Sequence, residues 1–214
     1  MPRDLADLSF ARFLEGREDL AMEGEYDCAL FEGLVLEDAE VRGAQLTECA
    51  MTGSTITGGS MRHTRFNDVW IQGTQWIRAD LSETSWIDTE LVMNAWSGVE
   101  AFGARLRRVK FYNCKFDSVN LRGAHLNEVS FVDCVLRHVD IGEAKLTSVT
   151  FPGTEIDALS MRKATLQKVD LRTARSIGIF EGVESLRGAT INSSQLMDLA
   201  PVFAHNIGLN VSDR

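Results

Sequence analysis

Between Tyr26 and Leu171, every fifth residue of the chain is large and apolar, apart from Ala101. The pattern covers thirty positions without a change of phase. The residue two positions before each large one is small in all but three pentads. Neither an α-helix, with a period of 3.6, nor a flat strand, with a period of 2, brings every fifth residue to one face. A period of five therefore predicts a coil of short sides, each burying one small and one large residue.

A slower rhythm of 20 residues predicts the number of sides in each coil. Phe111, Phe131 and Phe151 are spaced by 20, and alanines recur at the same interval at positions 104, 124, 144 and 164. Four pentads then make one turn of a square solenoid whose side chains stack from coil to coil. Thirty pentads make seven and a half coils, or about 36 Å of rod at the ~4.8 Å spacing of hydrogen-bonded strands.

The pentads at positions 79–83, Ala-Asp-Leu-Ser-Glu, and 6–10, Ala-Asp-Leu-Ser-Phe, carry a family resemblance. They are similar to the unit Ala-(Asp/Asn)-Leu-x-x of the pentapeptide-repeat proteins. The resemblance implies an all-β fold: a right-handed quadrilateral parallel β-helix with a short C-terminal helical cap. The family's repeat supports several roles, so it predicts architecture better than function.

We expect three segments along the chain. Residues 1–23 form an N-terminal cap, because Leu8 and Phe13 fit the pentad but in a different phase. Its acidic residues are expected to be a solvated cover for the first coil, whose edge is otherwise unpaired. Residues 24–192 form the β-helix, with an irregular excursion over 172–185. Residues 193–214 form a C-terminal helix and a terminal strand.

The C-terminal segment has helical spacing after two N-cap candidates, Ser193 and Ser194. Pro201 is expected to kink or divide this helix, and 209–211 to form a short strand. The helix is either a lid on the last coil or a dimer contact. In the fluoroquinolone-resistance members that the chain resembles, a C-terminal helical element pairs two rods end to end. The resemblance implies a homodimer with contacts at Leu196, Met197, Leu199, Val202 and Phe203.

Charge is distributed unevenly along the chain. Residues 1–100 hold 19 Asp and Glu against 7 Lys and Arg, a net charge of −12, and residues 101–214 hold 12 against 15, a net charge of +3, which together give the −9 of the whole chain. The rod is therefore expected to be electrically polarised along its length.

Carboxylates also recur at the 20-residue spacing, in two columns. The corner column lies two residues after a large residue and consists of Glu48, Asp68, Asp88, Arg108 and Glu128. The side column lies just before a large residue and consists of Glu40, Ser60, Asp80, Glu100, Asn120 and Asp140. The carboxylates either keep an elongated surface soluble or imitate a nucleic-acid backbone in a basic DNA-binding groove. The eight acidic members of the two columns are the candidate partner-binding residues.

A basic girdle opposes this interpretation in the middle coils. It consists of Arg105, Arg107, Arg108, Lys110, Lys115 and Arg122. Direct nucleic-acid binding is an alternative, but the net negative charge and the lack of a DNA-docking motif argue against it. The girdle could also pair with acidic edges of neighbouring coils or contact an acidic patch of a partner.

Catalytic motifs are absent from the sequence. We find no P-loop, dinucleotide fingerprint, HExxH, nucleophile elbow or metal-spaced Cys/His cluster, so we expect no enzyme, cofactor or metal site.

Cys49, Cys114 and Cys134 fall in the small inward column and are expected to be reduced core thiols, whereas Cys28 falls at a turn. No apolar run is long enough to span a membrane and the N-terminus has no signal core, so we expect a cytoplasmic protein.

The leading hypothesis follows from the resemblance to the family's DNA-mimicking members. It is a non-enzymatic acidic rod that binds DNA gyrase, or a related type II topoisomerase, and protects it from quinolones or another gyrase poison. The basic girdle confines a DNA-like surface to the coils before residue 100. The alternative is a pentapeptide-repeat scaffold or interaction module with an unrelated protein partner, in which acidity serves only solubility.

Overall fold

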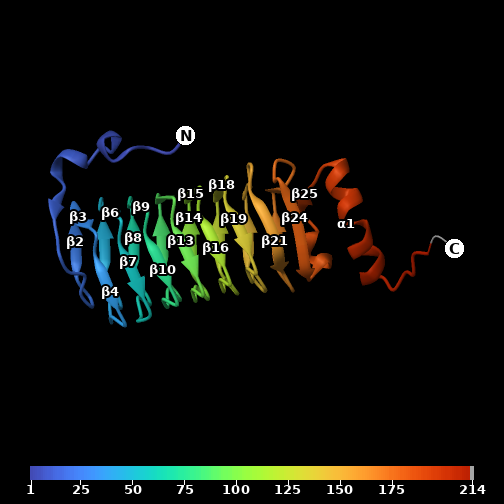
Figure 1. The fold of residues 1–214 in the computed structure, drawn as a ribbon, viewed down its shortest axis with the longest axis horizontal. Coiled ribbons are helices and arrows are strands. Elements are labelled where there is room, and N and C mark those ends of the chain that lie inside the picture. Colours follow the sequence, from blue (N-terminus) through green and yellow to red (C-terminus); the bar gives the residue numbers. More distant parts are fainter. Residues whose placement is uncertain (213–214) are drawn as a thin grey trace.

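The computed structural model describes residues 1–212 and is a parallel β-solenoid, as predicted (Figure 1). In the regular coils each strand pairs in parallel with the strand 20 residues further on, as Trp76 does with Trp96. Three sides of the coil are sheets of eight, eight and seven strands. The fourth side is held by isolated bridges such as Glu40 to Ser60. The period of five and the four-sided coil are therefore confirmed.

The strands of the solenoid are mostly three residues long. The β2 sheet contains β2 Glu25–Asp27, β5 Gln45–Thr47, β8 Arg65–Asn67, β11 Ser85–Ile87, β14 Arg105–Arg107, β17 His125–Asn127, β20 Lys145–Thr147 and β22 Thr165–Gln167. The β3 sheet contains β1 Glu15–Gly16, β3 Ala29–Glu32, β6 Ala50–Thr52, β9 Trp70–Gln72, β12 Glu90–Val92, β15 Lys110–Tyr112 and β18 Ser130–Val132. The β4 sheet contains β4 Val35–Glu37, β7 Thr55–Thr57, β10 Gln75–Ile77, β13 Ala95–Ser97, β16 Lys115–Asp117, β19 Val135–Arg137, β21 Glu155–Ser160 and β24 Ser176–Glu181. A separate pair joins β23 Val169–Asp170 to β25 Ala189–Thr190.

The interior is formed by the two inward columns predicted from the repeat. Phe131 stacks on Phe111 and Phe151, with ring centroids 4.9 and 5.2 Å away and planes within 6° of parallel. Phe66 stacks on Trp86 in the same manner, with centroids 3.8 Å apart. In-register stacking arises because identical positions of successive coils lie directly above one another, and it gives each ring close contacts on both faces.

Three polar residues in the small inward column bond to the backbone of the preceding coil. The Asn94 side-chain amide donates to the Ile71 carbonyl over 2.9 Å, and the Thr64 and Thr154 hydroxyls donate to Val41 and Phe131. Each of these side chains is buried, and a buried polar group needs such a partner. This explains how the column accepts Asn and Thr as well as Ala and Cys.

Every pentad turns through a left-handed residue. The second residue after each large one, from Cys28 to Lys168, has a positive φ. Gly53 occupies such a position with open space around it, as expected where the backbone disfavours a Cβ. Non-glycine residues at the equivalent positions, such as Asp68 with φ of 49°, hold the corner column at the outer edge of the turn.

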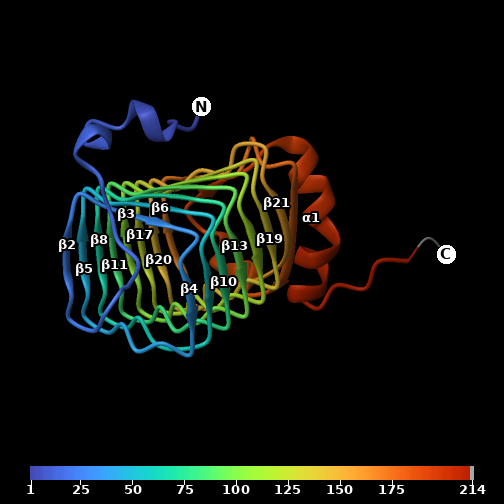
Figure 2. The ribbon, with the colours of Figure 1, turned by 60° about the vertical axis from the view of Figure 1, so that its left-hand side comes forward.

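The N-terminal residues differ from the prediction. Residues 1–14 form no out-of-phase coil; they include η1 Leu5–Asp7 and η2 Ala11–Phe13 and run outside the solenoid along its length (Figures 1 and 2). We call residues 1–14 the strap. Phe13, expected to point inward, is 55% exposed.

The strap packs on the outer face of the β3 sheet. Leu8 and Phe10 are buried in a cluster with Trp70, Val92 and Tyr112, all of which point outward from their coils. The pentad pattern places inward residues only, so it could not predict this second apolar cluster. Residues 6–8 match the family unit in sequence, but Leu8 packs on the outside of the coils and not in their interior.

The predicted cover of the first coil is formed by the residues after the strap. β1 pairs with β3 and thereby occupies the edge of the β3 sheet. Leu20 is buried in the main core at the open end of the solenoid. This arrangement covers the edge of the β3 sheet and part of the core end.

The C-terminal end also departs from the prediction in detail. The expected excursion over 172–185 contains a six-residue strand, β24, that pairs with β21, followed by η3 Val183–Leu186. The helix α1 Ser193–Asn206 is capped by Asn192, not by a serine, and is continuous through Pro201. No strand forms at 209–211 within the described residues, and residues 213–214 lie outside them.

α1 closes the last coil (Figure 2). Leu199 is 2% exposed and belongs to the main core. The Gln195 side-chain amide donates to the carbonyls of Leu171 and Ala174, at 2.8 and 3.3 Å. The helix therefore supplies both the apolar cover and the hydrogen-bond partners that a next coil would provide. No helix among residues 1–212 has the length and hydropathy needed to cross a membrane.

Candidate acidic interface

The two predicted carboxylate columns form as continuous ladders. In the side column, Asp80 pairs with Ser60 on one coil and with Glu100 on the next. In the corner column, Glu48, Asp68 and Asp88 each follow the last residue of a β2-sheet strand, and those strands are paired in register. Members of one column are thus about one strand spacing, ~4.8 Å, apart.

The two columns lie on opposite edges of the rod. The corner column occupies the turn between the β2 and β3 sheets, at position 48 and its equivalents. The side column begins the fourth side, directly after the β4 sheet. Two sides of the square separate these edges in either direction along the coil. A single flat partner surface therefore cannot contact both columns, whereas a groove that surrounds the rod can.

One pair of charges interrupts the corner column. The Arg108 guanidinium donates through Nε and Nη2 to the two carboxylate oxygens of Asp88. This side-chain hydrogen bonding lowers the pKa of the Asp88 carboxyl below its usual value. Asp68, which is half-buried, and Glu128, which is exposed, make no ion pair within residues 1–212.

Most of the side column is occupied by internal contacts. Glu40 forms an ion pair with Arg42 at 2.6 Å, and Asp140 lies 3.5 Å from Arg122. Glu100 accepts a hydrogen bond of 2.6 Å from the Asn120 amide. The side column is consequently less negative than its sequence indicates.

The strongest acidic surface is the first coil and its cap. Residues 15–48 contain eleven carboxylates and two arginines, and we call this surface the acidic end. Within the described residues, only Glu15 and Glu40 of the eleven make an ion pair, with Arg17 and Arg42. All but Glu48 belong to exposed residues. The charge of the N-terminal half, expected to follow the two columns, is therefore concentrated at one end of the rod.

A surface groove of about 600 Å³ connects the corner column to the strap. It is lined by Met1, Arg3, Asp68, Asp88, Thr89, Glu90, Arg108, Lys110 and Glu128. Four of these are carboxylates and three are basic side chains, so the groove is lined by charges of both signs. The sequence pattern could not predict this groove, because one wall is the strap.

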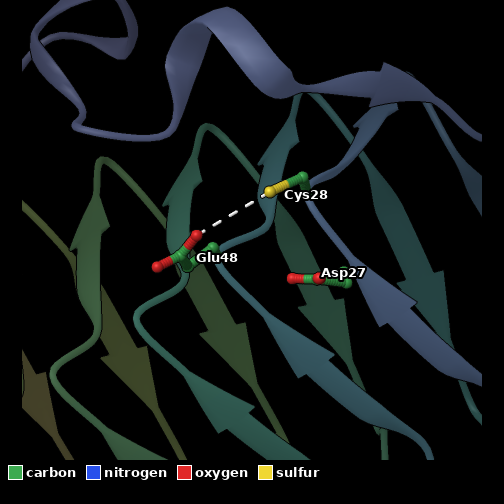
Figure 3. Close-up of side chains that lie close together, drawn as sticks. All are labelled: Asp27, Cys28 and Glu48. Carbon is green, nitrogen blue, oxygen red and sulfur yellow. Dashed lines mark hydrogen bonds between the residues drawn. The ribbon is translucent and has the colours of Figure 1, made fainter.

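Cys28 lies within the acidic end, between Asp27 and Glu48 (Figure 3). Its thiol is 3.7 Å from a Glu48 carboxylate oxygen, and one ligand atom from each of the three residues lies within 4.8 Å of the others. Burial raises the pKa of the Cys28 thiol, and the charges of Asp27 and Glu48 raise it further. Exposed acidic groups commonly cluster in this way without an ion, so we assign no metal here.

The five predicted dimer residues occupy different environments. Leu196 and Met197 are 50% and 73% exposed on α1. Val202 and Phe203 are half-buried against the core, and Leu199 is buried within its own protomer. Leu199 therefore belongs to the lid and is not available to a partner, which corrects that part of the prediction.

Repeat and coil together define a parallel β-solenoid with charged outer sides. The resemblance to the pentapeptide-repeat family is confirmed: a family model described as a pentapeptide repeat region matches residues 104–199. No curated protein matches the chain.

Solved structures are also similar to the chain, at low sequence identity. A structure of QnrB1, a plasmid-mediated fluoroquinolone resistance protein, is 14% identical with a TM-score of 0.48, over 92% of this chain and 95% of that one. HetL, a pentapeptide repeat protein involved in heterocyst differentiation regulation from the cyanobacterium Nostoc sp. strain PCC 7120, is 16% identical with a TM-score of 0.28, over 82% and 92%. Likeness at this level carries no functional conclusion.

Proposed function

We propose that this protein is a cytoplasmic, non-enzymatic binding protein whose acidic end and corner column occupy a DNA-binding groove of DNA gyrase or a related type II topoisomerase. The observation that carries the proposal is the acidic end, where nine of eleven carboxylates have no internal cation among the described residues. Unpaired carboxylates repel one another, and a basic groove that normally holds phosphates would relieve that repulsion. Occupation of the groove would protect the enzyme from quinolones or another gyrase poison.

The corner column extends the acidic end along the rod. Glu48 and Asp68 lie on consecutive coils, and the first internal cation of the column is Arg108. Their spacing of ~4.8 Å compares with 3.4 Å of helix axis per phosphate on one DNA strand. The proposed contact is therefore the first three or four coils, and the remaining coils lie outside it.

A supercoiling assay with purified gyrase, with and without a fluoroquinolone, tests the proposal. The test variant reverses Asp27, Glu48 and Asp68 to Lys. Lys163 and Lys168 already occupy left-handed positions equivalent to 48 and 68, so the backbone accepts lysine there. The control variant reverses the exposed carboxylates Asp157, Glu184 and Asp198, which changes the net charge equally at the other end of the rod.

We expect the wild type and the control to inhibit or protect gyrase, and the test variant to do neither. No effect of the wild-type protein at micromolar concentration would refute gyrase as the partner. Equal activity of the two variants would show that the acidic end is not the contact.

We further propose a homodimer through α1. Leu196 and Met197 are exposed apolar side chains, and Phe180, which is 77% exposed, shares a surface hollow with Val202 on the same end of the rod. Contact with a second copy would remove these side chains from water. Light scattering should give twice 23.8 kDa, and substituting Leu196 and Met197 by Glu should give 23.8 kDa. A wild-type mass of 23.8 kDa would refute the dimer.

The alternative function is a scaffold for an unrelated protein partner. The observation that favours it is the neutralisation of Glu40, Asp88 and Asp140 by Arg42, Arg108 and Arg122. A rod that needed two continuous negative columns would not place arginines on them. The variant with Lys at positions 27, 48 and 68 distinguishes the two functions. If it still binds the protein's cellular partner, the alternative is favoured.

A further inference from the structure

The outer face of three successive strands carries cations without an ion-pair partner among residues 1–212. The outward residues of β14, β17 and β20 are Arg105, Arg107, His125, Asn127, Lys145 and Thr147. Arg105, Arg107 and Lys145 are exposed and make no ion pair or side-chain hydrogen bond within residues 1–212. We call these six residues the basic face.

The Arg and Lys side chains of the basic face are spread over three consecutive coils. Arg105 pairs in register with His125, and His125 with Lys145, so Arg105 and Lys145 are two strand spacings, about 9.6 Å, apart. Arg107 lies on the same strand as Arg105 and pairs with Asn127. The nearest corner carboxylates do not all compensate these cations, because Glu143 is held by Arg122 at 2.6 Å. An anionic ligand on this face would supply the missing counter-charges.

The remainder of the predicted girdle does not belong to this face. Arg108 is paired with Asp88, and Arg122 with Asp140 and Glu143. Lys110 points from β15 in the β3 sheet and Lys115 from β16 in the β4 sheet. The structure thus separates the basic face from two arginines that are paired within the rod and from two lysines that lie on other sides of the coil.

The chemistry of the basic face favours a phosphate backbone over an acidic protein surface. Its outward side chains are Arg, His, Lys, Asn and Thr, with no apolar residue and no Phe, Tyr or Trp among them. A protein–protein interface has an apolar, aromatic-rich centre. Phosphate contacts use Arg, Lys, Asn and Thr side chains, which make up most of this face.

Net charge does not decide against such binding, because the acidic end lies on different coils from the basic face. Glu128, which follows β17, borders the face and makes no ion pair within residues 1–212. On the same side of the rod, the first strand carries Glu25 and Asp27, four coils away from Arg105. The Debye length is about 10 Å at 0.1 M salt, shorter than the ~19 Å of four coils, so the acidic end is largely screened from the basic face.

We propose that the basic face binds the phosphate backbone of a nucleic acid, independently of sequence, through Arg105, Arg107 and Lys145. This proposal does not depend on the proposed gyrase function, since it concerns a different part of the rod. Three phosphates neutralised on duplex DNA give a slope of log K against log salt of about −2.7, hence about 40-fold weaker binding at 200 mM than at 50 mM.

Fluorescence anisotropy with the full chain and two labelled probes of about 20 nucleotides, a duplex and a single strand, tests this. The test variant replaces Arg105, Arg107 and Lys145 by Gln, which the same sheet already carries outward at Gln45 and Gln167. The control replaces Lys115, Lys163 and Arg187 by Gln, three exposed cations elsewhere, and changes the net charge equally. Circular dichroism and the urea midpoint establish that both variants fold.

We expect the wild type and the control to bind at low salt, and the test variant to bind at least about 10-fold more weakly, with a slope closer to zero. Binding of both probes indicates that a phosphate backbone is sufficient for binding. The probe that binds more tightly shows whether the face prefers duplex or single-stranded nucleic acid. The proposal is overturned if neither probe binds at about 50 mM salt. It is also overturned if the control loses as much affinity as the test variant, or if the chain binds polyglutamate but neither probe.

Discussion

Arg3 and Glu90 connect residues 87 positions apart in the sequence. The Arg3 backbone amide donates to one oxygen of the Glu90 carboxylate over 2.6 Å, and its Nε donates to the other over 3.2 Å. Glu90 is 4% exposed, and the neighbouring Trp70 indole donates to the Arg3 carbonyl. A buried carboxylate requires such partners, so this contact fixes the end of the strap on the third and fourth coils.

Replacing Arg3 by Ala should loosen the strap without unfolding the rod. Glu90 would lose its only ion-pair partner among the described residues, at a cost of about 1–3 kcal/mol. Hydrogen exchange of the Leu8 and Ala11 amides should become about 10-fold faster or more, since 1.4 kcal/mol corresponds to a factor of ten. Arg17→Ala is the control, because the Arg17–Glu15 pair is exposed. Equal exchange in the two variants would contradict the anchoring role.

Replacing Phe131 by Ala should destabilise the solenoid strongly. The ring is 2% exposed and stacked between two others, so truncation leaves a cavity that costs about 3–5 kcal/mol in the free energy of unfolding. Phe102→Ala is the matched control, because Phe102 is 51% exposed and its loss should change stability by no more than about 0.5 kcal/mol. Urea unfolding of both variants measures the difference. Similar midpoints would show that stacking in the core does not determine stability.

Two glycines should differ in their tolerance of a side chain. Gly53→Ala places a Cβ in open space and costs only the left-handed backbone, about 1–2 kcal/mol. Gly59→Ala places a Cβ against the Ala39 carbonyl oxygen, so the backbone of the adjacent coil must move. We expect its cost to exceed that of Gly53→Ala by about 1–3 kcal/mol, measured by urea unfolding. An equal loss in the free energy of unfolding for both variants would mean that the adjacent coil moves away from the new Cβ at little cost.

Cys28 should react with thiol reagents slowly near neutral pH. Burial and the charges of Asp27 and Glu48 raise its pKa, so less thiolate is present at a given pH than for an ordinary thiol. Its alkylation rate should continue to increase at pH values where a model thiol has reached its plateau. Replacing Asp27 by Asn and Glu48 by Gln should lower the pKa and increase the rate at pH 8. An unchanged pH profile in that variant would exclude the two carboxylates as a cause.

The remaining thiols provide an internal control for that experiment. Cys49, Cys114 and Cys134 are buried within the coils, and burial raises the pKa of Cys49 to about 11. Only Cys28 should therefore be modified in the folded protein, and peptide mapping identifies the site. Modification of all four thiols at the same rate would indicate that the reagent reacts with an unfolded population.

The repeat predicted the core because each inward residue is determined by its own position in the pentad. Leu106 and Phe131 are buried because each is the large residue of its pentad. Each side of the coil buries one small and one large residue, so the pentad position alone decides which residues point inward. The ladders of Asp68 and Asp88, and of Asp80 and Glu100, follow from the same period. Sequence could also assign charge to each half of the rod, since that requires only counting.

Side-chain partners could not be predicted from the period. The Arg108–Asp88 pair depends on which rotamer each residue adopts, and it changes the charge of the corner column. The girdle illustrates the same limit: Arg105 and Arg107 are unpaired whereas Arg122 is held by two carboxylates. Adjacent cations in the sequence therefore have different roles on different sides of the coil.

The amino-acid sequence by itself determined the solenoid, its four sides and its inward residues, because period five acts through contacts between identical positions of neighbouring coils. Only the tertiary structure decided where residues without that period lie. The strap uses Leu8 and Phe10 on the outside of the β3 sheet, and Leu199 joins the core although its helix follows a different pattern. Such contacts join segments that have no common repeat, so their energy depends on three-dimensional packing and not on spacing along the chain.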